Sequence, residues 1–67
     1  MIIKITEHAK FKMYKEGITE DMVKEAIGKG SKYKQTDGLL AVYKYYCVAY
    51  KRIGKSIYKI KTVYTNK

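Results

Sequence analysis

Lysine and tyrosine alternate through the second half of the chain, a combination of residues that suits contact with nucleic acid. Lysine ammonium groups attract phosphates whatever the base sequence, and exposed aromatic rings give unstacked bases a surface to stack on. Together these residue types favour single-stranded or looped RNA as a ligand. The segments with this pattern are Lys32-Tyr33-Lys34, Tyr43-Lys44-Tyr45-Tyr46, Tyr50-Lys51-Arg52 and Tyr58-Lys59-Ile60-Lys61.

The distribution of charge indicates which part of the chain would attract such a ligand. Residues 1–28 carry five lysines and five acidic residues, which cancel, whereas residues 29–67 carry nine lysines and Arg52 against Asp37 alone. The formal net charge of +9 therefore comes from the second half. An excess confined to one structural half makes a field with a direction, which we interpret as an RNA-binding surface.

The same pattern also has a purely structural explanation. Tyrosine is favoured in strands, and lysines commonly protect exposed sheet edges from pairing with other chains. A protein partner that uses an exposed strand edge or the tyrosines is a further alternative. The sequence leaves these readings open beside RNA binding.

His8 is the only histidine and the first candidate for proton transfer. It would lie in the first turn of a helix, where it can act as an acid, a base or a phosphate contact, or simply cap or pack. One His and one Cys among scattered carboxylates offer no metal-ligand spacing. The glycine-rich run at 28–31 follows a helix instead of a strand, which is the wrong context for a phosphate loop. We expect no metal and no cofactor.

Length and composition predict one domain over residues 1–67. A chain of this size has room for one core, and its single cysteine, Cys47, cannot form an internal disulfide. Cys47 lies in an apolar run and is interpreted as a buried, reduced thiol. The apolar start of the chain is too short for a signal segment, and no stretch is long enough to span a membrane. These features predict a cytoplasmic protein.

The elements that must position the candidate residues begin with a short strand and two helices. Ile3 and Ile5 alternate with Lys4 in the strand. Thr6 is a good N-cap for a helix over residues 7–16, which Gly17 would end. Thr19 caps a second helix, and glycines at 28 and 30 end it. Both helices are short and must pack against a sheet to be stable.

From Lys32 onward the apolar period changes to two, which predicts strands over 32–36, 39–53 and 56–65. Asp37-Gly38 and Gly54-Lys55 mark tight turns between them, and the long middle strand is expected to bend near residues 44–46. In the last strand, strict alternation puts Tyr58, Ile60, Thr62 and Tyr64 on one face and Ile57, Lys59, Lys61 and Val63 on the other. The predicted fold is α+β, in the order β-α-α-β-β-β, with two N-terminal helices on a small antiparallel sheet.

Two segments resemble a known family. The run from His8 to Ile18, His-Ala-Lys-Phe-Lys-Met-Tyr-Lys-Glu-Gly-Ile, resembles the His-Ala-x-x-Arg-Met-x-x-Arg-Gly-Ile opening of the domain family of unknown function numbered 4258. The closing run from Tyr58 to Tyr64 resembles that family's final strand, which runs into Thr-Val-Tyr. The likeness spans essentially the whole chain.

That family's order of elements is similar to the fold of RelE-like toxins, small basic endoribonucleases that cleave messenger RNA, often on the ribosome. By this resemblance a 2′-hydroxyl would attack the phosphate, with His8 and Tyr64 as proton-transfer residues. The implied partners are ribosome-bound mRNA and a small acidic antitoxin protein. The resemblance implies that Lys12, Arg52, Lys59 and Lys61 contact phosphates. Lys51, from the Tyr50-Lys51-Arg52 segment, is a further candidate RNA contact.

Two departures from the family pattern separate binding from catalysis. Lys12 stands where the family has an arginine, which keeps the charge but loses bidentate phosphate geometry, and Glu16 reverses the charge at the second such position. A non-catalytic RNA-binding or protein-interaction module on the same scaffold is therefore the alternative function. The sequence also leaves open a homodimer and the identity of the RNA target.

Overall fold

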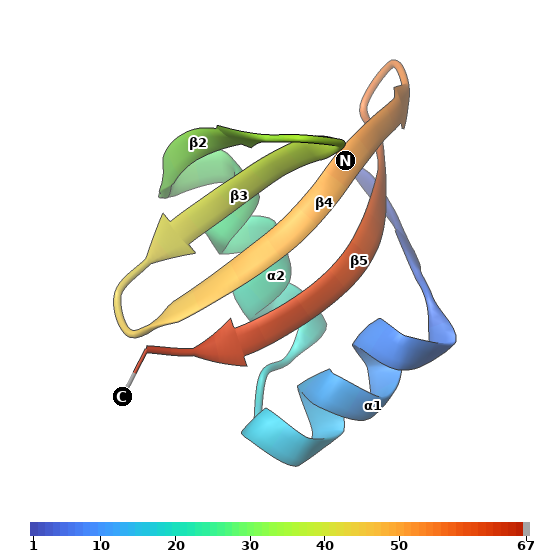
Figure 1. Cartoon of the computed structure of the whole chain (residues 1–67). Coiled ribbons are helices and arrows are strands. Elements are labelled where there is room, and N and C mark those ends of the chain that lie inside the picture. Colours follow the sequence, from blue (N-terminus) through green and yellow to red (C-terminus); the bar gives the residue numbers. More distant parts are fainter. Residues whose placement is uncertain (67) are drawn as a thin grey trace.

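Two helices and one five-stranded sheet account for residues 1–66, the part of the chain that the computed structural model describes (Figure 1). The strands lie in the order β1-β5-β4-β3-β2, so the first strand lies beside the last. In chain order the elements are β1 (Ile2–Ile5), α1 (Glu7–Glu16), α2 (Glu20–Lys29), β2 (Ser31–Gln35), β3 (Gly38–Tyr43), β4 (Tyr46–Gly54) and β5 (Ile57–Thr65). The α+β class is confirmed.

Helix α1 has the bounds that the sequence predicts, and its caps explain why. The Thr6 hydroxyl accepts a hydrogen bond from the Ala9 amide at 3.1 Å, which satisfies one free N–H of the first turn. Gly17 ends α1 with a φ of 72°, a left-handed conformation that glycine adopts without strain. Thr19 caps α2 in the same way, accepting from the Met22 amide at 3.2 Å.

The prediction of one long strand over residues 39–53 was wrong. Lys44 has a φ of 53° and with Tyr45 forms a turn that divides this segment into β3 and β4. The sequence has no glycine, asparagine or aspartate at this turn, so the usual hairpin signal is missing. The Lys44 ammonium lies 5.3 Å from the centre of the Tyr43 ring, a cation–π contact within the turn.

The prediction of a purely antiparallel sheet also needs correction. Strand β1 pairs in parallel with β5, with Ile3 opposite Tyr58 and Ile5 opposite Ile60, so the sheet is mixed. The two helices connect β1 to β2 at the opposite edge of the sheet. The following strands then lead back across the sheet, so β5 can pair in parallel with β1. The Thr6 hydroxyl then donates to the Ile60 carbonyl at 3.0 Å and fixes the exit of β1 beside β5.

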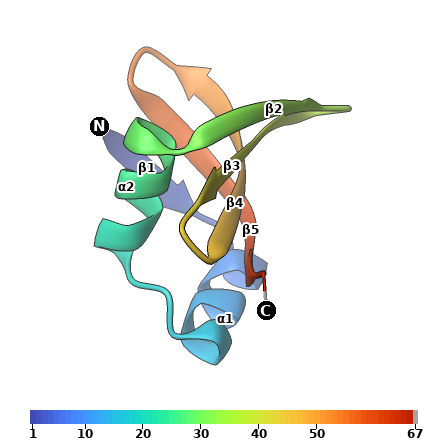
Figure 2. The ribbon, with the colours of Figure 1, turned by 90° about the vertical axis from the view of Figure 1, so that its left-hand side faces the viewer.

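Both helices lie on the same side of the sheet (Figure 2). Ala9 and Met13 of α1 and Val23, Ala26 and Ile27 of α2 are buried against that side. The strands contribute alternate residues to this core, namely Ala41, Tyr46, Val48, Tyr50, Ile60 and Val63. The opposite side of the sheet, here called the open face, has no helix over it. Among residues 1–66, no helix is long and apolar enough to cross a membrane.

Candidate nucleic-acid interface

Apolar side chains form the centre of the open face. Leu40 and Val42 of β3 and Cys47 and Ala49 of β4 alternate with core residues and therefore point to this face. We call these four residues the apolar floor. Cys47 and Ala49 are only 2% and 6% exposed, although no helix covers them. Their neighbours on the same face must cover them.

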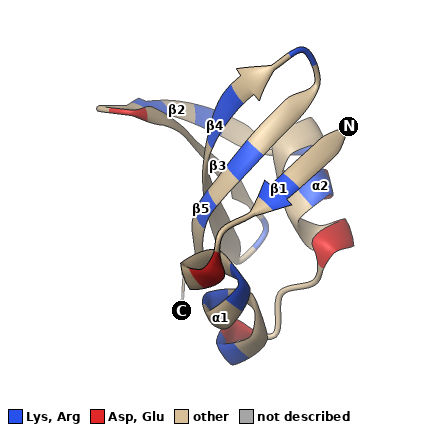
Figure 3. Ribbon diagram, turned by 90° about the vertical axis from the view of Figure 1, so that its right-hand side faces the viewer, with Lys and Arg blue, Asp and Glu red and all other residues tan. Residues whose placement is uncertain are grey.

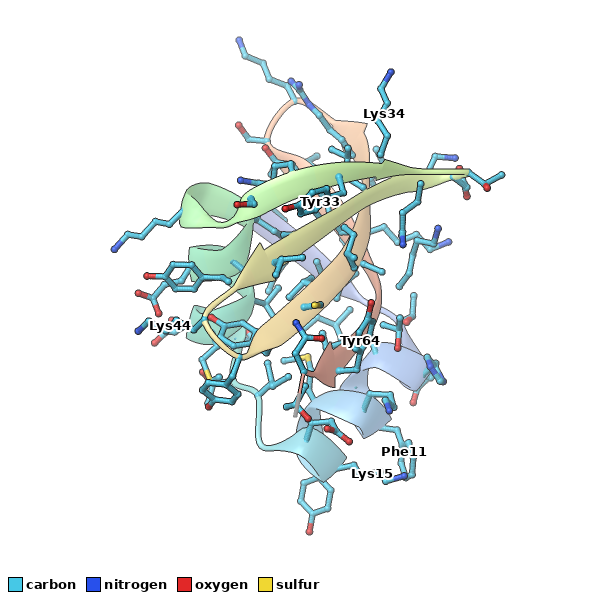
Figure 4. All side chains as sticks on the ribbon, turned by 60° about the vertical axis from the view of Figure 1, so that its left-hand side comes forward. Phe11, Lys15, Tyr33, Lys34, Lys44 and Tyr64 are labelled. Carbon is cyan, nitrogen blue, oxygen red and sulfur yellow. The ribbon has the colours of Figure 1, made fainter. Side chains whose placement is uncertain are left out.

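Two tyrosines flank the apolar floor from opposite strands (Figure 4). The register places Tyr33 of β2 opposite Leu40, and Tyr64 of β5 opposite Cys47. Tyr33 is 57% exposed and Tyr64 is 37% exposed, so solvent reaches both residues. The open face thus carries an exposed aromatic side chain at each margin of the apolar floor, and exposed aromatic rings suit stacking with unpaired bases.

Three lysines extend the open face at the end of the apolar floor. Lys51 of β4 lies directly opposite Lys59 of β5, and Lys61 joins them. We call Lys51, Lys59 and Lys61 the lysine cluster. Opposed like charges are unfavourable in a sheet, and the sheet tolerates them here beside a carboxylate. Asp37, at the tip of the β2–β3 hairpin, has its Oδ1 2.9 Å from Lys51 Nζ and its Oδ2 3.8 Å from Lys61 Nζ.

A β-bulge at Lys61 changes which way the residues after it face. Ala49 pairs with Thr62 but Tyr50 pairs with Ile60, which leaves Lys61 as an extra residue in β5. The predicted strict alternation in the last strand is therefore wrong. Beyond the bulge Val63 faces the helices, whereas Tyr64 faces away from them. Bulges that re-aim one side chain are common beside functional sites.

Asp37 is held as a carboxylate by the lysine cluster. A hydrogen bond from Lys51 lowers the pKa of the Asp37 carboxyl, and the charges of Lys51, Lys61 and Lys59 lower it further. The Lys61 ammonium also donates a hydrogen bond to the main-chain carbonyl of Asp37. In Figure 3, lysine and arginine segments lie along β4 and β5, while most acidic segments lie on the helices.

The two predicted proton-transfer residues lie near the same stretch of β5. His8 Nε2 is 3.1 Å from Thr62 Oγ1, within hydrogen-bonding distance. Tyr64 follows Thr62 by two residues and therefore points to the same side of the strand. Burial raises the pKa of the Tyr64 hydroxyl, and the neighbouring Cys47 raises it further. The Tyr64 hydroxyl therefore keeps its proton at neutral pH and can donate it.

Lys12 and Arg52, two other predicted contacts, are placed apart from the lysine cluster. Lys12 Nζ lies 3.8 Å from Glu16 Oε2 on α1. A hydrogen bond from Thr65 lowers the pKa of that glutamate. Arg52 lies opposite Tyr58 and donates from Nε to the Gly54 carbonyl at 3.3 Å. Neither residue converges on Asp37.

The apolar floor itself was missed from the sequence. Leu40 and Ala49 both fall in the single strand predicted over residues 39–53, and only the turn at residues 44–45 brings them into register. Within residues 1–66, no three His, Cys, Asp or Glu side chains are grouped as metal ligands would be.

Comparisons of this chain with protein-family models, with curated proteins and with solved structures find no match. The resemblance to the domain family numbered 4258 and to the RelE-like fold stays a prediction from the sequence.

Proposed function

We propose that this protein binds single-stranded RNA across the open face of its sheet. The observation that carries the proposal is that Lys51 follows Ala49 by two residues in β4, so the lysine cluster lies at the end of the apolar, tyrosine-flanked floor. Ammonium groups would bind the phosphates, while unpaired bases would lie over Leu40 and Val42, the partly exposed half of the apolar floor, between Tyr33 and Tyr64.

The shape of this face favours a single strand over a duplex. Bases can stack on Tyr33 or Tyr64 only when they are unpaired and splayed out, because a duplex keeps them stacked on each other. No cavity is found in the described part of the chain, so the open face is a platform and not a deep pocket. A platform suits an extended strand that lies along it.

The test is a binding assay with a labelled single-stranded RNA, with and without ribosomes, over a range of salt. For single strands, log K falls with log salt by about 0.7 per contacted phosphate. Three contacts predict a loss of about ten- to twentyfold in affinity between roughly 50 and 200 mM salt. Binding should weaken in Lys61→Ala much more than in Lys55→Ala, which removes an equal charge from the β4–β5 turn. No salt-sensitive retention would instead favour a protein partner.

RNA cleavage is a second candidate function, favoured by the contact between His8 and Thr62 beside Tyr64. His8 would take the proton of a 2′-hydroxyl, whose oxygen would attack the adjacent phosphorus. Tyr64 would give its proton to the leaving 5′-oxygen, so the products would be a 2′,3′-cyclic phosphate and a 5′-hydroxyl end. His8→Ala should then abolish cleavage and preserve RNA retention.

The sequence resemblance to RelE-like toxins adds a partner to this second candidate. An acidic antitoxin would neutralise the basic half of the chain, and a small acidic reading frame beside the gene would support that pairing. Retention of RNA without cleavage, by contrast, would leave a non-catalytic binding module.

A further inference from the structure

Three ammonium groups around one carboxylate make an anion site that the protein fills with its own side chain. Asp37 has two carboxylate oxygens, and each faces one lysine: Oδ1 faces Lys51 and Oδ2 faces Lys61. Lys59 stands opposite Lys51 and its charge acts on Asp37, but its ammonium makes no hydrogen bond or ion pair among residues 1–66. A carboxylate has no third oxygen to offer it.

We infer that the lysine cluster binds the terminal phosphate of an RNA strand in place of the Asp37 carboxylate. This inference rests on the proposed function and names the part of the RNA that the site selects. A terminal phosphate has three free oxygens, one for each lysine, and carries between −1.5 and −2 charges at pH 7. An internal phosphodiester has two free oxygens and one charge, the same as the Asp37 carboxylate, so it would leave the third lysine without an oxygen partner.

The backbone of the hairpin tip that carries Asp37 is fixed, so only the Asp37 side chain can move away from the lysine cluster. Gly38 packs so closely on β4 that a Cβ there would lie 2.3 Å from the Tyr50 carbonyl oxygen. The Asp37 carboxylate is itself 62% exposed and can swing into solvent when a phosphate arrives. The fixed backbone keeps the carboxylate near the lysine cluster. Before a phosphate binds, the carboxylate holds Lys51 and Lys61 in place.

The alternation of β5 brings the third lysine to the site. Lys59 and Lys61 are two residues apart and therefore point to the same face, where Lys59 stands opposite Lys51. An opposed lysine pair is unfavourable by itself. An anion that needs three donors at one point accounts for the grouping of all three lysines.

The experiment uses fluorescence anisotropy to compare the binding of three oligouridine RNAs of about eight nucleotides. The three RNAs differ only at their ends. One has hydroxyls at both ends, one a 5′-phosphate and one a 3′-phosphate. The protein should bind one phosphorylated RNA about fivefold more tightly than the hydroxyl RNA, and the two phosphorylated arms identify the end. Lys59→Ala should reduce this preference to less than about twofold, whereas the control Lys55→Ala should keep it.

The outcomes separate this inference from the proposed function. Equal binding of all three RNAs overturns the terminal-phosphate site and leaves RNA binding intact. A preference that survives Lys59→Ala also overturns it. Failure of every RNA to bind overturns the proposed function together with the inference. Thermal melting of each variant checks that the exposed substitutions leave the fold unchanged.

Discussion

Lys51 Nζ lies 2.9 Å from Asp37 Oδ1, and this ion pair joins β4 to the tip of the β2–β3 hairpin. Asp37 is the only acidic residue between 29 and 67, so it is the single negatively charged side chain in the basic half of the chain. The pair is exposed, and pairs of that kind contribute little to stability. Its main effect is to arrange the lysines and to occupy the position of an incoming anion.

Replacing this carboxylate should therefore strengthen RNA binding. Asp37→Asn removes the competing charge from the lysine cluster, and we expect affinity for single-stranded RNA to rise about threefold. The control is Glu20→Gln, which removes the same charge from the first turn of α2 on the far side of the sheet. Titration of both variants with one labelled RNA makes the comparison. An equal gain in both would mean that only net charge matters.

The same ion pair predicts a specific dependence of stability on pH. Because the folded pKa of Asp37 is lowered below 3.8, its contribution is fully present above pH 3.8 and is lost as pH falls through the lower folded value. The wild type should thus melt at a slightly higher temperature than Asp37→Asn at pH 7. The two should melt together near about pH 2, below both pKa values. A difference that persists at that pH would assign the effect to packing instead.

Two glycines should respond in opposite directions to alanine. Gly38 has a φ of 115° and no room for a Cβ, so Gly38→Ala should lower the free energy of unfolding by more than about 1 kcal/mol. Gly28 lies in α2 with no atom within 4 Å of an added Cβ, and Gly28→Ala should raise the free energy of unfolding by about 0.5–1 kcal/mol.

Urea denaturation of both glycine variants measures this contrast. A neutral Gly38→Ala would mean that the hairpin tip can move away from β4. The tip would then no longer hold Asp37 at the lysine cluster.

The helices could be predicted from the sequence because their signals are local. Thr6 and Gly17 bracket α1, and each acts through groups within a few residues of itself. The division of β3 from β4 could not be predicted, since Lys44 adopts a left-handed conformation without a residue type that favours it. Tertiary contacts impose that turn: the buried Tyr46 donates its hydroxyl to the Met22 carbonyl at 2.7 Å.

In the candidate site, too, the residue types could be predicted from the sequence, but their arrangement in space could not. The lysines and tyrosines could be named from their residue types, and His8 from being the sole histidine. Their grouping depends on the bulge at Lys61 and on the register of β3 with β4, both of which follow from long-range packing. The separation of Arg52 from Lys51, adjacent in sequence, follows from the pleat of β4, which turns neighbours to opposite faces.

Substitutions of Tyr64 separate the two candidate functions most clearly. In RNA binding its ring would stack on a base, whereas in RNA cleavage its hydroxyl would donate a proton. Tyr64→Phe keeps the aromatic surface, so RNA affinity should stay within about twofold, while Tyr64→Ala should weaken binding by about fivefold or more through lost stacking. If the protein cleaves RNA, Tyr64→Phe should abolish cleavage, because phenylalanine has no proton to donate.

Anisotropy and a gel assay for cleaved RNA, run on the same samples, measure both effects. Tyr14→Phe is the matched control, since Tyr14 is 89% exposed on α1 and lies outside the open face. Because the pKa of Tyr64 is raised above 10.0, cleavage that depends on its proton should persist up to at least that pH unless another group becomes limiting. Cleavage that survives Tyr64→Phe would remove this residue from proton transfer and leave it a stacking role alone.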